Sequence, residues 1–128
     1  MDGLRILVVE DYELNAEILM ELLSMEGVQC DYAENGKVAV ECFEASHEDT
    51  YDMILMDVKM PVMDGYEAAA AIRAGSHPNA KTIPIVALTA NAFKEDIQRA
   101  LDAGMDEHIA KPVRVDKIKA AVSRLVKR

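Results

Sequence analysis

Three carboxylates of this sequence lie directly after short apolar runs. Glu10 and Asp11 follow residues 4–9 (LRILVV), and Asp57 follows residues 53–56 (MILM). If the runs are strands ending at one edge of a sheet, the three charges repel one another and raise each other's pKa unless a cation compensates. Oxygen-only ligands of this kind suit Mg²⁺, which binds one or two carboxylates together with waters and a phosphate oxygen. We therefore expect a Mg²⁺ site here.

A hydroxyl and an ammonium group follow two further apolar runs. Thr89 ends residues 83–89 (IPIVALT), and Lys111 follows residues 107–110 (EHIA). Beside a carboxylate nucleophile and a metal, a hydroxyl donor and a fixed positive charge can neutralise the equatorial oxygens of a transferring phosphoryl group. The combination predicts phosphoryl chemistry at one edge of the sheet.

Each of these residues also has an ordinary structural alternative. An acidic pair after a strand is commonly a solvated loop, and a lysine before a proline is commonly a surface residue. Thr89 and Asp57 are each suited to capping a helix or a turn. The functional interpretation depends on coincidence, because every one of these side chains falls at the carboxyl end of a predicted strand.

Apolar periodicity predicts five strands that alternate with five helices. The strands are expected at residues 4–9, 28–33, 53–56, 83–89 and 107–110. The helices are expected at residues 14–25, 38–45, 65–74, 93–101 and 115–125. Such alternation with apolar strands predicts an α/β domain whose parallel sheet is covered by helices on both faces. Ligands of such sheets bind outside the carboxyl ends of the strands.

Composition narrows the classes of partner. Lys and Arg total 14 against 23 Asp and Glu, for a formal charge of -9, which argues against direct binding to nucleic acid or to an anionic membrane surface. No apolar run approaches the roughly 18 residues of a membrane span. Cys30 and Cys42 lack metal-ligand spacing, and we expect reduced, buried thiols in a cytoplasmic protein.

Four segments together resemble the receiver domain of two-component response regulators. They read ILVVED, ILMDVKMPVMDGYEA, PIVALTANA and AGMDEHIAKPV, in the order of that family. The resemblance covers essentially the whole chain, so residues 1–128 are expected to form a single receiver domain. The runs MPVMDG, ALTANA and AKPV most resemble the receivers of hybrid sensor histidine kinases.

The resemblance implies a flavodoxin-like, doubly wound (βα)5 fold and a role for each site residue. Asp57 corresponds to the phosphoacceptor, and Glu10 and Asp11 correspond to the acidic pair that holds Mg²⁺. Thr89 corresponds to the switch hydroxyl, and Lys111 to the lysine that pairs with the phosphoryl group.

Two further positions take their roles from the same resemblance. The backbone carbonyl of Lys59 corresponds to a third protein ligand of Mg²⁺. Pro112 corresponds to a proline whose preceding peptide bond is commonly cis.

The implied function is a signalling domain of a phosphorelay. It takes a phosphoryl group from a phosphohistidine and then changes conformation or passes the group on. It is not a conventional enzyme, although it assists its own phosphorylation and dephosphorylation. The implied partner is a histidine kinase or a histidine phosphotransfer protein, and a monomer is expected.

One position departs from the family pattern. The fifth predicted strand carries His108 where the family has Tyr or Phe. A buried imidazole needs a hydrogen-bond partner, and a buried charge is costly. We therefore predict a largely exposed His108 and weak remodelling of the face formed by the fourth helix and fifth strand.

Other functions remain open from the residues alone. A receiver-shaped interaction module without phosphorylation would have no reason to keep Asp11, Asp57, Thr89 and Lys111 together. A flavin or nucleotide binder of the same fold places a glycine- or hydroxyl-rich loop after the first strand. Here that loop is acidic (EDYELN) and repels phosphate. A phosphatase with a DxD pair is disfavoured because Lys59 stands two residues after Asp57.

The first predicted helix is more apolar than one buried stripe requires. Ile18, Leu19, Leu22 and Leu23 together exceed what a single face buries. We expect part of this helix and the adjacent acidic edge to contact a histidine-bearing helical bundle. The alternative is that all four side chains belong to the core.

Overall fold

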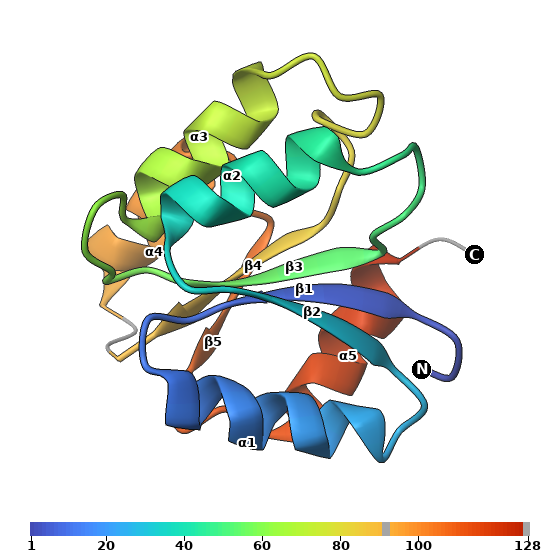
Figure 1. The fold of residues 1–128 in the computed structure, drawn as a ribbon. Coiled ribbons are helices and arrows are strands. Elements are labelled where there is room, and N and C mark those ends of the chain that lie inside the picture. The colour runs from blue at the N-terminus through green and yellow to red at the C-terminus, as the bar shows by residue number, and fades with distance from the viewer. Residues whose placement is uncertain (91–92, 127–128) are drawn as a thin grey trace.

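The computed structural model describes residues 1–90 and 93–126. Five strands alternate with five helices (Figure 1). In chain order they are β1 (Arg5–Val9), α1 (Glu13–Ser24), β2 (Gln29–Ala33), α2 (Gly36–Ala45), β3 (Met53–Asp57), α3 (Gly65–Ala74), β4 (Ile85–Thr89), α4 (Lys94–Asp102), β5 (Glu107–Ala110) and α5 (Val115–Leu125). The predicted alternation is therefore confirmed, with boundaries that differ by a few residues.

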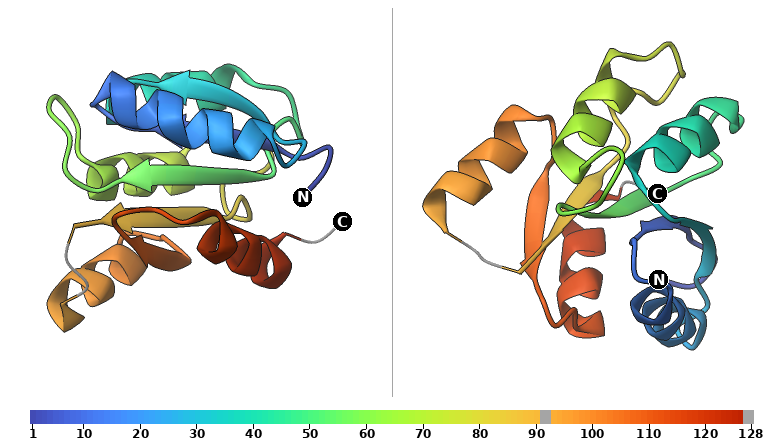
Figure 2. Two further views of the ribbon diagram at one scale, coloured as in Figure 1. Left: turned by 90° about the horizontal axis from the view of Figure 1, so that it is seen from below. Right: turned by 60° about the vertical axis from the view of Figure 1, so that its left-hand side comes forward.

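All strand pairs are parallel, and the strand order is β2-β1-β3-β4-β5. α1 and α5 cover one face of the sheet, while α2, α3 and α4 cover the other (Figures 1 and 2). Because every strand runs the same way, all five carboxyl ends lie at one edge. The doubly wound architecture that the sequence predicts is confirmed.

Alternate side chains of each central strand supply two separate cores. Ile54 and Met56 of β3 pack towards α2 and α3, where they meet Phe43 and Ile72. Met53 and Leu55 pack towards α1 and α5 on the other face. A strand that is buried on both faces reads as a continuous apolar run, which explains the composition of residues 53–56.

Local capping sets where two of the helices begin. Asn35 accepts a hydrogen bond from the backbone N–H of Val38 at 2.9 Å, so α2 starts two residues before the predicted position. Asp64 and Glu67 form a reciprocal capping box at the start of α3, which begins at Gly65 as the sequence predicts.

The outer face of α1 decides between the two alternatives that the sequence left open. Leu19 and Leu23 are buried, whereas 52% of Ile18 and 38% of Leu22 are exposed. The four residues are thus divided between two faces, and the alternative in which all belong to the core is wrong. The small residue Ala16 completes the buried stripe.

The two cysteines are free, and both are half-buried rather than buried as predicted. Burial, together with the charge of Asp31, raises the pKa of the Cys30 thiol to about 11. Within the described residues, no helix has the length and apolar character needed to cross a membrane.

Candidate functional site

Asp57 is the last residue of β3 and is only 4% exposed. The chain turns sharply after it, and Gly65 returns to donate a backbone hydrogen bond to Val58 at 2.9 Å. A side chain at Gly65 would lie 2.4 Å from the carbonyl oxygen of Asp57, so only glycine permits this approach. The turn therefore holds the Asp57 backbone in place at the edge of the sheet.

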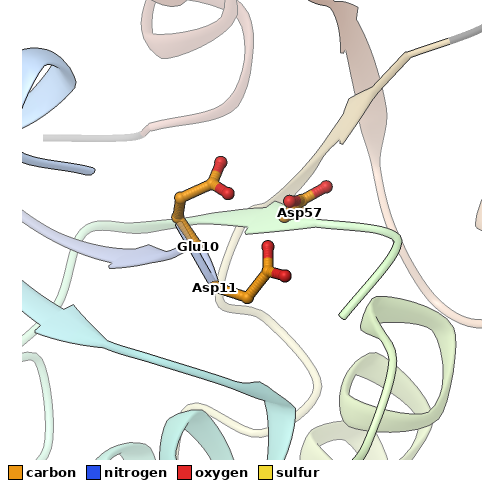
Figure 3. A group of neighbouring side chains, drawn as sticks. All are labelled: Glu10, Asp11 and Asp57. Carbon is orange, nitrogen blue, oxygen red and sulfur yellow. The ribbon is translucent and has the colours of Figure 1, made fainter. Parts of the chain in front are cut away.

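The acidic pair directly follows β1, the neighbouring strand. Glu10 is buried and accepts a hydrogen bond from the backbone N–H of Tyr12 at 3.2 Å, whereas Asp11 is exposed. Carboxylate oxygens of Glu10, Asp11 and Asp57 all lie within 4.8 Å of one another (Figure 3). A hard divalent cation with oxygen ligands at about 2.1 Å fits between them with small side-chain adjustments.

Lys111 brings a positive charge from the end of β5. Its Nζ lies 3.0 Å from Oδ2 of Asp57 and 3.5 Å from Oε2 of Glu10. The Lys111–Pro112 peptide bond is cis, as the resemblance implied. Partial burial acts to lower the pKa of the ammonium, but its contacts with Asp57 and Glu10 outweigh that effect and raise the pKa above its ordinary value.

The cost of a buried charge shows most clearly at Glu10. Burial raises the pKa of its carboxyl to about 7. The Tyr12 N–H opposes this increase, the charge of Asp57 adds to it, and the charge of Lys111 reduces it. Burial is thus the main cause of this shift, and a cation bound beside Glu10 would offset the cost of its charge.

Thr89 ends β4 and is 6% exposed. Its Oγ1 is fully buried and has no hydrogen-bond partner among the described residues. A buried hydroxyl without a partner loses free energy that a ligand oxygen restores. It is therefore poised as a donor to a group that enters the site.

All six predicted site residues line one cleft of about 280 Å³. They are Glu10, Asp11, Asp57, Lys59, Thr89 and Lys111. The fold therefore brings together the six residues that the sequence and the resemblance assigned to this site.

The same cleft is lined by residues that sequence reasoning missed, among them Asn15, Tyr66 and Asp96. Tyr66 falls in the apolar pattern of α3 and Asp96 in the acidic first turn of α4. Neither carries a sequence signal that distinguishes a cleft residue from an ordinary helical one.

His108 differs from the prediction made for it. It is half-buried rather than largely exposed, and it lines a cavity of about 380 Å³ with Ile97, Leu101 and Arg124. The exposure prediction failed because α4 and α5 both flank the short edge strand β5 and cover part of the imidazole. Weak remodelling of this face stays a prediction.

Known proteins resemble this chain over nearly its full length. A family model described as the response regulator receiver domain matches residues 6–123. The sensor histidine kinase RcsC of Escherichia coli is 38% identical over 127 residues, which cover 99% of this chain and 13% of that protein. Hybrid signal transduction histidine kinase G of Dictyostelium discoideum is 40% identical over 123 residues, covering 94% of this chain and 4% of its own length. The chain thus spans a small part of these relatives.

Two solved structures add detail. The receiver domain of a Pseudomonas aeruginosa sensor histidine kinase, with a magnesium ion in its active-site cleft, has a TM-score of 0.84 and 37% identity, covering 96% of this chain and 97% of that one. The receiver domain of Saccharomyces cerevisiae Ssk1, crystallised with the histidine phosphotransfer protein Ypd1, has a TM-score of 0.84 and 28% identity, covering 98% and 90% of the two chains. The fold, the site and the family match over residues 6–123 lead to one conclusion: this chain belongs to the response regulator receiver domain family.

Proposed function

We propose that this chain accepts a phosphoryl group from a phosphohistidine onto Asp57, with Mg²⁺ bound in the cleft. The observation that carries the proposal is the position of the Asp57 carboxylate. It lies 3.0 Å from Lys111 and within 4.8 Å of two further carboxylates. Acidic clusters on protein surfaces are commonly solvated and have no function. Here Asp57 and Glu10 are buried, so water cannot fully compensate their charges.

Asp57 acts as the nucleophile. One carboxylate oxygen forms a bond to phosphorus as the P–N bond of the phosphohistidine breaks, and the electron pair of that bond stays on the imidazole nitrogen. Lys111 and the Thr89 hydroxyl each approach a phosphoryl oxygen, the first as a charge and the second as a hydrogen-bond donor. Glu10, Asp11, Asp57 and the carbonyl of Lys59 would hold Mg²⁺, which would neutralise charge on the phosphoryl oxygens.

Intact mass after incubation with acetyl phosphate and Mg²⁺ tests this proposal. We expect the mass of one added phosphoryl group in the parent and none in Asp57→Asn or with excess EDTA. Asp102→Asn is the matched control, because Asp102 is an exposed aspartate on α4 outside the cleft, and it should label as the parent does. Equal labelling of Asp57→Asn and parent contradicts the assignment. No labelling of the parent favours the unphosphorylated interaction module.

The partner is inferred to be a histidine-bearing helical bundle that docks on α1. A groove of about 460 Å³ runs between α1 and the loop after β5, and it is lined by Ile18, Leu22 and Val113 as well as by Lys111. The exposed apolar side of α1 therefore adjoins the cleft, which suits a partner that has to place a phosphohistidine next to Asp57. The phosphotransfer complex of the Ssk1 receiver supports this class of partner.

Titration with a phosphotransfer protein tests the docking surface. Ile18→Ser should weaken binding at least about tenfold, since it removes an exposed apolar side chain from the groove. Leu101→Ser is the matched control, because Leu101 is 48% exposed but lies on α4. Chemical-shift changes confined to α4 and α5, or equal losses in the two variants, would place the surface elsewhere.

The remaining proposals concern the state of the chain in the cell. We expect a cytoplasmic monomer that promotes its own phosphorylation and dephosphorylation without being a conventional enzyme. The formal charge of -9 and the free thiols support this view. Light scattering before and after phosphorylation tests the monomer.

A further inference from the structure

The groove beside α1 and the cleft share a boundary. The described residues that line both are Glu10, Asn15, Leu88, Ala90 and Lys111. Two of them are charged and belong to the phosphoryl site, and two are apolar. Asn15 is the one uncharged polar side chain of this shared set. A side chain that reaches from a docked partner into the cleft has to pass this boundary.

Asn15 interrupts an apolar wall. The other residues that α1 contributes to the groove are Ile18, Leu19 and Leu22. Leu19 and Leu22 follow Asn15 at helical spacing, so these three side chains lie along one side of the helix. An apolar residue at position 15 would extend this surface for a docked helix. The amide at the cleft end of the groove is therefore not what apolar docking alone requires.

The side chain of Asn15 is not committed to the fold. It is exposed and makes no hydrogen bond within the described part of the chain. An exposed amide is commonly solvated and has no further role. Here it shares the boundary with the apolar side chains of Leu88 and Ala90. Apolar surface beside one neutral amide suits a heteroaromatic ring, which has apolar faces and polar edges.

The donor of the phosphoryl group carries such a ring. An imidazole has two nitrogens, and in a phosphohistidine only one of them is bonded to phosphorus. If the other nitrogen carries a proton, the electron pair of the breaking P–N bond stays on the first nitrogen and the ring leaves as neutral imidazole. Without that proton the ring would leave as an anion beside three carboxylates. A hydrogen-bond acceptor at the second nitrogen holds the proton there and fixes the orientation of the ring.

We propose that Asn15 is a substrate-positioning residue that binds the imidazole ring of the phosphoryl donor. This inference rests on the proposed function and deepens it. Oδ1 of Asn15 accepts a hydrogen bond from the N–H of the ring nitrogen that is not bonded to phosphorus, and the ring lies against Leu88 and Ala90. The phosphoryl group passes to Asp57, and the proton stays on the ring throughout. Acetyl phosphate has no ring and gains nothing from this contact, so Asn15 favours phosphohistidine over acyl phosphates.

Labelling by two small donors tests this role. N-Phosphoimidazole supplies the ring and acetyl phosphate does not, so the ratio of their labelling rates isolates the contact with the ring. In Asn15→Leu, which keeps a similar shape but removes the amide, this ratio should fall about tenfold, as expected for one lost hydrogen bond to a charged group. In Asn15→Asp, which keeps an acceptor oxygen, the ratio should be no lower than in the parent.

Glu17→Gln is the matched control for these variants. Glu17 is exposed on α1 and lines neither the cleft nor the groove, so the ratio should equal that of the parent. An unchanged ratio in Asn15→Leu overturns the role of Asn15. A fall in Asn15→Asp as large as in Asn15→Leu overturns it as well, because the acceptor oxygen would then contribute nothing.

A measurement without phosphoryl transfer separates failure of this role from failure of the proposed function. In Asp57→Asn with Mg²⁺, N-phosphoimidazole should shift the side-chain amide signal of Asn15, which is identified by its loss in Asn15→Leu, and acetyl phosphate should shift it less. Equal shifts with the two donors, or none, overturn the role of Asn15 whatever the labelling shows. A shifted signal together with a parent that neither donor labels supports the ring contact and contradicts the proposed function alone.

Discussion

At the edge of the sheet opposite the cleft, His77 and Arg73 have hydrogen-bond partners for their polar atoms, although Oε1 of the nearby Glu44 lacks one among the described residues, whereas at the cleft edge three carboxylates gather and a buried hydroxyl has no partner. His77 is buried and packs against Phe43, with the two rings tilted and their centroids 4.3 Å apart. Its Nδ1 accepts from the backbone N–H of Asn79 at 3.0 Å, and its Nε2 lies 2.9 Å from the carbonyl oxygen of Ser46. Arg73 likewise donates hydrogen bonds to the carbonyl oxygens of Gly104 and Ala80 and to the carboxylate of Asp106.

The cleft edge has the opposite character. Thr89 has a buried hydroxyl without a partner among the described residues, and Glu10 carries a pKa of about 7. Satisfied polar groups stabilise a fold, while crowded or unsatisfied ones lower its stability and persist where a ligand compensates. The comparison predicts that substitutions at the distal edge lower stability but leave phosphorylation unchanged. Substitutions at the cleft should impair phosphorylation but cost little stability.

Arg73→Met should have the largest effect on stability. It removes three hydrogen bonds and leaves the carbonyls of Gly104 and Ala80 without this donor, at a cost of about 3 kcal/mol in the free energy of unfolding. Urea denaturation measures this cost. Labelling by acetyl phosphate should stay at the parental level under native conditions, and a loss of labelling in folded protein would remove the distinction between the edges.

Glu10→Gln should change the pH dependence of stability. The pKa of Glu10 is raised from an ordinary 4.5 to about 7, so its contribution to stability is fully present below pH 4.5 and is lost as the pH rises through about 7. Without metal, the parent should therefore lose up to about 3 kcal/mol relative to Glu10→Gln across that range. Denaturation in EDTA at both ends of the range measures this. Glu41→Gln, at an exposed position on α2, should keep the parental dependence, and identical profiles for all three proteins would contradict the raised pKa of Glu10.

His77→Phe should have a smaller cost at the distal edge. The ring keeps its packing on Phe43, but the hydrogen bonds with Asn79 and Ser46 are lost, which costs about 1–2 kcal/mol. Thermal and urea unfolding report the loss, and labelling should be unaffected. A variant as stable as the parent would show that these hydrogen bonds contribute nothing net.

Thr89→Val should have the smallest effect on stability and a clear one on chemistry. Replacing a buried, unpartnered hydroxyl with a methyl group should leave the free energy of unfolding within about 1 kcal/mol of the parent, or raise it. The labelling rate should fall roughly tenfold, because a charge-assisted hydrogen bond to the phosphoryl group is lost. Thr89→Ser keeps the hydroxyl and should label normally. Strong destabilisation of Thr89→Val would mean that the hydroxyl has a structural partner.

The sequence by itself determined the ten elements and the edge at which the chemistry gathers. Strand and helix periods differ, and each period is a pattern of neighbouring residues alone, although the Asn35 cap that starts α2 two residues early went unrecognised. Parallel strands place their carboxyl ends together, and for that reason Glu10, Asp57, Thr89 and Lys111 were predictable as one group.

Only the tertiary structure decided how side chains divide between partners and faces. Two apolar stripes compete on α1, and packing against the sheet sets the rotation that buries Leu23 and exposes Ile18. The half-burial of His108 depends on α4 and α5, which are distant in sequence. The missing partner of Thr89 and the contact between Tyr66 and Arg99 likewise arise between separate elements. Sequence periodicity cannot predict such features, because they depend on distances between separate elements and not on the spacing of residues within one element.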